Sequence, residues 1–285
     1  MKKLSAPFRW WGGKGDSKRL QNTMINIPYS DGYCEPFFGA GSVFWNRRRS
    51  PIEVINDLDG NIINLMRVLQ DQKQAEELFR RLLFTMQSRQ EFDDACKIMF
   101  DTKKSKPIDL AWGFYVKMNQ GFSGIPKSKS WRFPKKRLGV ELAWWNKLDK
   151  FWKWVGRIQK VWVEHQDAIQ VMKRWDTENM VFYLDPPYVT NTRKSGCVYN
   201  QEQDDGYHKN LVKCILGLSG AVVLSGYNNE IYSQLTKGGW VVREYVVSLN
   251  CSHTKHKASK TKVTESIWQN PRCLEILNKK GLGLK

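Results

Sequence analysis

Short apolar runs that end in polar or acidic residues recur in the first and last parts of the chain. Runs of this length, bounded by turn residues, are typical of buried strands. Such strands are predicted near the start of 33–44 and over 52–55, 161–163, 181–184, 221–225, 241–249 and 265–268. Helical periodicity follows over 60–70 and 207–217, and a glycine-rich turn within 33–44 leads to a helix start that contains Ser42. This alternation predicts an α/β fold with a ligand crevice at its strand ends.

The middle of the chain has a different pattern. Residues 71–113 are typical of charge-mixed helices, and 141–158 predicts a further helix. Between them, 119–140 is rich in Gly, Ser, Pro and Lys, with an interleaved Trp-Arg-Phe at 131–133, which predicts a loop or hairpin that touches a partner. These patterns divide the chain into one unit formed by 1–70 and 156–285 and a mainly helical insertion, 71–155.

Composition narrows the class of partner. The chain has 285 residues, of which 41% are hydrophobic, so it can bury a core. Its formal charge of +18 exceeds what solubility requires and indicates a polyanion, with nucleic acid favoured. The 13 Trp among these basic residues suit stacking on bases. A merely basic soluble protein is the alternative that charge alone leaves open.

The sequence predicts neither membrane insertion nor a metal centre. The N-terminus is basic but has no apolar signal-peptide core, and no stretch is long and apolar enough to span a bilayer, so we expect a cytoplasmic protein. Six cysteines without a Cys-x-x-Cys pair suit reduced thiols. The one metal-like cluster is Cys251, His253, His256 and Cys273, whose spacing matches no standard zinc pattern.

The most informative stretch follows the apolar run 181–184 and reads Asp185-Pro186-Pro187-Tyr188. The exocyclic amine of a nucleobase is a weak nucleophile because its lone pair is delocalised into the ring. The Asp185 carboxylate and the Pro186 carbonyl would accept its two N–H bonds and free the lone pair, since proline fixes the backbone of the second acceptor. Tyr188 would offer a face for an extruded base. An ordinary strand followed by a proline turn is the alternative.

Three other predicted strand ends carry features of a nucleoside site. Gly39 and Gly41 let the backbone turn tightly and approach a ligand. Asp57 ends the next strand, where an acid can accept both ribose hydroxyls, and a helix N-cap is an equal interpretation. Asp167 ends a third strand and would receive an adenine amino group. Because no dinucleotide or P-loop pattern is present, the cofactor favoured is a nucleoside without phosphate, S-adenosylmethionine.

In this order the motifs resemble those of Dam-type adenine-specific DNA methyltransferases, the alpha group of amino-methyltransferases. The resemblance covers nearly the whole chain: 8–14 is similar to the family's Trp-x-Gly-Gly-Lys element, 35–42 to its Phe-x-Gly-x-Gly loop, and 185–188 to its catalytic tetrapeptide. It implies a Rossmann-like class I methyltransferase sheet with an inserted DNA-recognition domain. It also implies S-adenosyl-L-methionine as methyl donor, S-adenosyl-L-homocysteine as product, and double-stranded DNA as partner of a cytoplasmic, nucleoid-associated enzyme of prokaryotic or phage type.

The resemblance also implies residue roles. The residues expected at the cofactor are Trp10, Lys14, Glu35, Phe37, Gly39, Gly41, Asp57, Asp167 and Asp185. The catalytic group is Asp185, Pro186, Pro187 and Tyr188, of which Pro186 and Tyr188 would handle a flipped adenine. A core position for Trp10 and a phosphate contact for Lys14 are the alternatives. Ser225 and 265–268 are expected to be structural.

Target recognition is expected in the insertion, where 119–124 resembles the entry to the family's recognition hairpin. Beyond it, 127–133 departs from the form of GATC readers, so the recognition sequence stays open. The residues expected at DNA phosphates or guanine edges are Asn119, Lys127, Lys129, Arg132, Lys135, Lys136 and Arg137.

Other functions share these features. A cytosine N4-methyltransferase needs the same amine chemistry, although Ser-Pro-Pro-Tyr is commoner there. RNA or protein-amide methylation acts on related planar amines, and a silent DNA-binding relative would keep the fold. A cognate restriction endonuclease and the oligomeric state are not readable from one chain.

Overall fold

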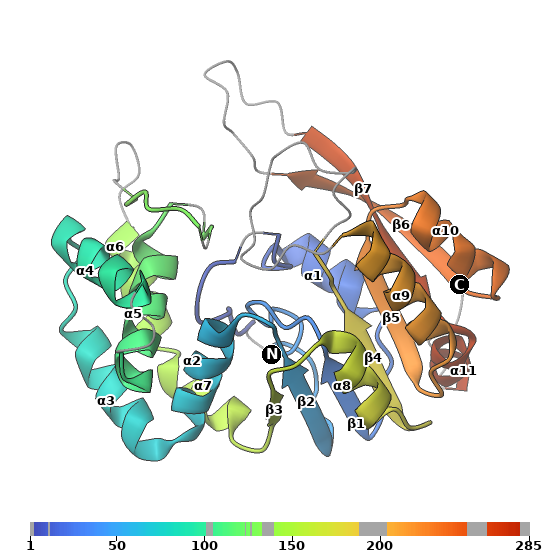
Figure 1. Cartoon of the computed structure of the whole chain (residues 1–285), viewed down its shortest axis with the longest axis horizontal. Coiled ribbons are helices and arrows are strands. Elements are labelled where there is room, and N and C mark those ends of the chain that lie inside the picture. The colour runs from blue at the N-terminus through green and yellow to red at the C-terminus, as the bar shows by residue number, and fades with distance from the viewer. Residues whose placement is uncertain are drawn as a thin grey trace.

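The computed structural model describes residues 3–10, 12–100, 105–122, 124–125, 127–132, 140–187, 204–249 and 261–279. These residues form a mixed α/β fold around a seven-stranded sheet (Figure 1). The strand order is β3-β2-β1-β4-β5-β7-β6. The α/β prediction is confirmed, and the sheet is consistent with a class I methyltransferase fold.

Five strands lie parallel and two do not. The parallel strands are β1 (Gly32–Glu35), β2 (Ile52–Asn56), β3 (Trp162–Glu164), β4 (Met180–Leu184) and β5 (Ala221–Gly226). β7 (Thr261–Gln269) pairs antiparallel with both β5 and β6 (Val241–Leu249). The chain adds β2 and β3 on one side of β1 and places β4 on the other. Open α/β sheets bind ligands at such a switch point, outside the carboxyl ends of the strands.

The central strands of the sheet are buried on both faces. Cys34, Phe182 and Val222 pack on one face with residues of α8 (Ala168–Trp175), α9 (Asp205–Leu216) and α10 (Glu230–Lys237). Tyr33 and Val223 belong to the core of the other face, which includes residues of α1 (Ser17–Met24), α2 (Gly60–Gln70) and α11 (Pro271–Lys279). Two buried faces explain why these strands read as continuous apolar runs.

Helices from the middle of the chain gather beside the sheet, at the left of Figure 1. They are α3 (Gln72–Leu83), α4 (Arg89–Phe100), α5 (Pro107–Gln120) and α6 (Val140–Leu148). α7 (Phe151–Ile158) and α5 both pack against α2, which joins this bundle to the sheet. The helical stretch predicted at 71–113 is therefore three helices, and the one at 141–158 is two. The boundaries 71–155 and the recognition role stay predictions.

The loop predicted at 119–140 contains a hairpin over its described residues. Gly121 and Trp131 form an antiparallel bridge. The Phe122 N–H donates to the Ser130 carbonyl at 2.9 Å, and the Arg132 N–H donates to the carbonyl of Gln120, also at 2.9 Å. The two arms of the loop are thus held together at its base.

The prediction that a helix starts at Ser42 is wrong. Residues 42–46 form consecutive turns, although the Trp45 N–H reaches the Gly41 carbonyl at 3.0 Å as in a helix. The Asn46 amide donates to the carbonyls of both Ser42 and Leu4, each at 2.9 Å. The irregular backbone at 42–46 is thus hydrogen-bonded to the N-terminal segment through Asn46.

Candidate active site

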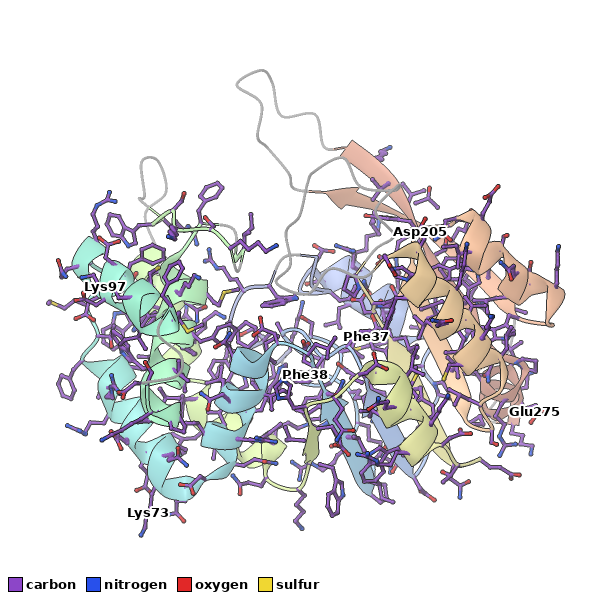
Figure 2. All side chains as sticks on the ribbon, in the orientation of Figure 1. Phe37, Phe38, Lys73, Lys97, Asp205 and Glu275 are labelled. Carbon is purple, nitrogen blue, oxygen red and sulfur yellow. The ribbon has the colours of Figure 1, made fainter. Side chains whose placement is uncertain are left out.

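A cavity opens at the carboxyl ends of β1, β2 and β4. Its lining comes from residues 35–43, 57–59 and 185–187, together with Tyr183, Ala168 and the N-terminal stretch around Lys14. Figure 2 shows Phe37 and Phe38 near the middle of the molecule, between α2 and α8. Three separate strand ends and the N-terminus therefore meet at one place.

The glycine loop is shaped for close approach. Gly39 and Gly41 have φ of +51° and +66°, a conformation that side chains with a Cβ rarely adopt. A Cβ at Gly41 would lie 2.3 Å from the Phe38 ring, and one at Gly39 would lie 3.0 Å from the Trp10 ring. A larger residue at Gly39 would therefore press on Trp10, and one at Gly41 would press on Phe38 within the loop itself.

Asp57 fixes the loop from the end of β2. Its Oδ2 accepts the Gly39 N–H at 2.7 Å, and its Oδ1 accepts the Asp59 N–H at 2.9 Å. Burial raises the pKa of the Asp57 carboxyl to about 6, while these backbone bonds hold it down. The N-cap of α2 is Asp59, whose side chain accepts the Asn61 N–H, so the alternative of Asp57 as helix cap is wrong.

Asp185 lies in a chain of buried charges. The Lys14 ammonium, 2% exposed, donates to its two oxygens at 2.7 and 2.9 Å. Lys14 also pairs with Glu265 Oε1 at 2.8 Å. Glu265 in turn accepts from Arg19 through both oxygens, at 3.2 and 3.1 Å. Two cations and two anions therefore alternate from Arg19 in α1 through Glu265 in β7 to Lys14 and Asp185 in the cavity wall.

These charges set the protonation of both acids. Burial raises the pKa of Asp185, and the charge and hydrogen bonds of Lys14 limit the rise. For Glu265, burial alone would raise the pKa, but Lys14 and Arg19 outweigh it and lower the pKa to about 2. Lys14 thus favours the ionised form of Asp185 and is itself neutralised by Glu265.

Glu265 and Arg19 were missing from the predicted site, because 265–268 was expected to be structural. Glu265 is 2% exposed within β7, and the Ser225 hydroxyl donates to it at 3.2 Å. Glu265 is the one acidic residue of β7, but the strand also holds Thr, Lys, Ser and Gln, so the sequence pattern does not single out Glu265 as buried.

A second acid of the cavity, Glu35, has a different environment. It is 2% exposed, and the Tyr33 hydroxyl donates to its Oε1 at 2.6 Å. Burial raises the pKa of Glu35 to about 8, although the Tyr33 hydrogen bond and the Arg47 charge pull it down. Glu35 is therefore mainly protonated at neutral pH.

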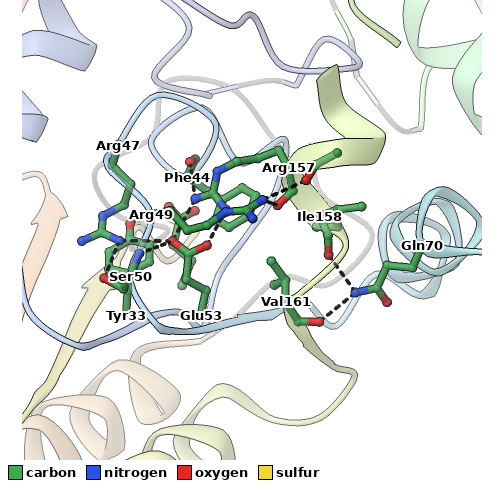
Figure 3. Close-up of polar contacts among 12 residues, drawn as sticks. Tyr33, Phe44, Arg47, Arg49, Ser50, Glu53, Gln70, Arg157, Ile158 and Val161 are labelled. Carbon is green, nitrogen blue, oxygen red and sulfur yellow. Dashed lines mark hydrogen bonds and ion pairs between the residues drawn. The ribbon is translucent and has the colours of Figure 1, made fainter. Parts of the chain in front are cut away.

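An arginine cluster supports this end of β1 (Figure 3). The Arg47 guanidinium lies 3.6 Å from the Tyr33 ring centroid and donates to Glu53 at 3.4 Å. Arg157 of α7 pairs with both oxygens of Glu53, one at 2.8 Å. Glu53 thus ties the sheet to the helices of the middle region.

The cavity brings together most of the residues predicted for it. Those that line it are Trp10, Lys14, Glu35, Phe37, Gly39, Gly41, Asp57, Asp185, Pro186 and Pro187. Asp167 is not in the lining: its Oδ1 accepts the N–H groups of Ile169 and Gln170 and caps α8, and its neighbour Ala168 lines the cavity instead. Tyr188 lies outside the described residues.

The residues predicted to contact DNA have varied positions. Lys127 and Lys129 are exposed, and Arg132 is half-buried. Asn119 is 8% exposed, and its amide donates to the carbonyls of Pro7 at 3.2 Å and Tyr115 at 3.0 Å, which links α5 to the N-terminal segment. Lys135, Lys136 and Arg137 lie outside the described residues.

Comparison with known families agrees with this geometry. The family model of the D12 class N6 adenine-specific DNA methyltransferases matches residues 10–249, which hold the glycine loop, Asp57 and Asp185. The chain belongs to this family. The resemblance to Dam-type adenine methyltransferases is confirmed, and the activity class of this D12 enzyme is DNA adenine methylation. No curated protein matches the chain.

Two further features of the structure concern metal binding and membrane insertion. Within the described ranges, no group of three or more His, Cys, Asp or Glu residues is placed to hold a metal ion. Of the metal-like cluster in the sequence, Cys251, His253 and His256 lie outside those ranges, and Cys273 is buried in α11. Among the helices that the structure describes, none has the length and apolarity to cross a bilayer.

Proposed function

We propose that this D12 enzyme transfers the methyl group of S-adenosyl-L-methionine to N6 of an adenine flipped out of duplex DNA. The observation that carries the proposal is Asp185, held by Lys14 at the end of β4 beside two prolines and facing the glycine loop. A sulfonium is an activated methyl donor, so the cofactor supplies the difficult chemistry. The protein supplies position and charge.

The cavity fits such a cofactor. Gly39 leaves room beside Trp10 that a Cβ would fill, and Gly41 lets the loop turn in a conformation that a Cβ would strain. Asp57 uses its two oxygens for two backbone N–H groups, and a carboxylate has about four lone-pair sites, so it can also accept ribose hydroxyls. Phe37 would pack on the adenosine. Asp167, at the start of α8, would reach the adenine only from the rim.

Asp185 and the Pro186 carbonyl would accept the two N–H bonds of the target amine. Lys14 counteracts the rise in the Asp185 pKa that burial causes and orients the carboxyl group, which favours its role as an acceptor. The amine becomes acidic only after it has gained the methyl group, so Asp185 need not be a strong base. Tyr188 would provide the stacking face for the base.

Duplex DNA would lie against the hairpin of the middle region. The exposed Lys127 and Lys129 support phosphate contacts there, and the charge of +18 supports a polyanionic substrate. We place the enzyme in the cytoplasm with the DNA it modifies, and a cognate restriction endonuclease stays a prediction.

The test is incubation of the pure protein with labelled S-adenosylmethionine and unmethylated plasmid, followed by digestion to nucleosides. Label is expected on N6-methyladenine, and Asp185→Ala should lower it about a hundredfold or more. The matched control is Asp31→Ala, which removes an exposed carboxylate at the amino end of β1. Label on N4-methylcytosine would refute the target, and undiminished methylation by Asp185→Ala would refute the site.

A further inference from the structure

The N-terminal segment 3–10 is held from outside the catalytic sheet. The carbonyl groups of Ala6 and Pro7 both accept from the Lys147 ammonium, each at 2.9 Å. The Ser5 carbonyl accepts the indole N–H of Trp154 at 2.8 Å. Three consecutive backbone carbonyls are thus bound by side chains that belong to α6 and α7 of the middle region.

A cavity adjoins the segment, and Lys147 lines it as well. This cavity of about 440 Å³ lies between residues 3–10 and the glycine loop, and Trp10, Gly13, Ala40 and Ser42 form walls of both this cavity and the candidate active site. Phe8 anchors the segment in the core, where it is 2% exposed and its ring lies 4.9 Å from that of Phe114 in α5. Beside the cavity, the backbone of the segment is held by the hydrogen bonds from α6 and α7 and by those between Leu4 and Asn46.

The hairpin touches the same segment. A Cβ at Gly124 would lie 2.8 Å from backbone and side-chain atoms of Arg9, and Gly124 has φ of +63°. Arg9 precedes Trp10, whose ring lies against Gly39 in the glycine loop. A displacement of the hairpin or of α6 therefore reaches the cofactor cavity through one short stretch of backbone.

We propose that Lys147 is a positioning residue that couples duplex DNA bound by the middle region to cofactor affinity, through residues 5–10 and Trp10. The inference rests on the proposed function. DNA on the hairpin would hold the segment so that Trp10 closes on the cofactor, and the cofactor would in turn favour DNA binding, because coupling between two binding sites is reciprocal.

The charge of Lys147 should make the coupling depend on pH. Burial lowers the pKa of Lys147 to about 7, and Lys150 contributes to the decrease. The charged groups that line the adjoining cavity with it are Lys3, Arg9 and Lys150, all of them cationic. The ammonium is a stronger donor than the neutral amine. Coupling should therefore fall as the pH rises through 7.

The experiment measures the affinity of the full chain for S-adenosylhomocysteine, which cannot react, by calorimetry with and without excess unmethylated duplex. In the wild type, DNA should tighten binding about fivefold or more. Lys147→Met should lose most of this DNA-dependent increase in affinity. Lys147→Arg should keep the increase, and the increase should no longer decline above pH 7. The matched control, Lys153→Met on the exposed side of α7, should keep the wild-type factor.

The inference would be overturned by a wild type without DNA-dependent affinity, or by a Lys147→Met variant that keeps the full DNA-dependent increase in affinity. Equal weakening with and without DNA would also overturn it, because that indicates a merely structural role. If Lys147→Met does not fold, Trp154→Phe removes the donor to Ser5 and must show the same loss. A wild type that binds no S-adenosylhomocysteine at all would instead refute the proposed function.

Discussion

Replacement of Glu265 by Gln tests the charge network behind Asp185. The substitution keeps the size of the side chain and one oxygen acceptor but removes the negative charge. Lys14 and Arg19, which are 2% and 8% exposed, would then share Asp185 as the one anion of the network that remains. A buried cation without a counter-charge is strongly unfavourable.

The loss of stability in Glu265→Gln can be derived in two ways. Removing one partner of a buried ion pair costs about 3–5 kcal/mol. Independently, the pKa of Glu265 lies at about 2 in the folded protein against 4.5 ordinarily, which corresponds to about 3 kcal/mol. Because the folded pKa is the lower one, this stability is present above pH 4.5 and is lost as the pH falls toward 2. About 2 kcal/mol of it should disappear between pH 6 and pH 3.

Urea unfolding of the wild type and Glu265→Gln, followed by tryptophan fluorescence from pH 6 to pH 3, provides the assay. The variant should be about 3 kcal/mol less stable at pH 6, and the difference should shrink at low pH. Glu275→Gln is the control, since its 3.1 Å pair with Arg272 is on the surface and its side chain is 56% exposed. A difference below about 1 kcal/mol at pH 6, or one that does not change with pH, would refute the reasoning.

Three further predictions concern the cavity. Gly41→Ala places a Cβ 2.3 Å from the Phe38 ring at φ +66°, so affinity for S-adenosylhomocysteine should fall about tenfold or more in calorimetry; wild-type affinity would contradict this. Glu35, with a folded pKa of about 8 against 4.5, is protonated on folding, so wild-type stability should fall by about 3 kcal/mol from pH 5 to pH 8, whereas Glu35→Gln should lack this slope in urea unfolding. Asp57→Ala removes the acceptor of the Gly39 N–H and should weaken cofactor binding about tenfold. Asp57→Asn keeps one acceptor oxygen and should weaken cofactor binding less. Equal losses of affinity in the two variants would show that the charge of Asp57 matters more than its contact with the loop.

Much of the fold is local and could be predicted from the sequence. The apolar runs at 181–184 and 221–224 identify β4 and β5, because a strand buried on both faces favours apolar side chains at consecutive positions. The glycine pair at 39 and 41 and the tetrapeptide at 185–188 are also local, since a backbone shape and a strand end each depend on adjacent residues. The order of these motifs was enough to indicate the family.

The partners of these residues were decided by the tertiary structure. Lys14 and Asp185 are 171 positions apart, and Arg19 and Glu265 are 246 apart. Their meeting depends on the sheet order, in which β7 enters antiparallel beside β5 and brings Glu265 to the carboxyl end of β5. The bonds from Lys147 to the N-terminal segment likewise join elements far apart in sequence. Hydrophobic periodicity shows which face of an element is buried. Charge pairing depends on which side chains are neighbours in space, and only the folded chain determines that.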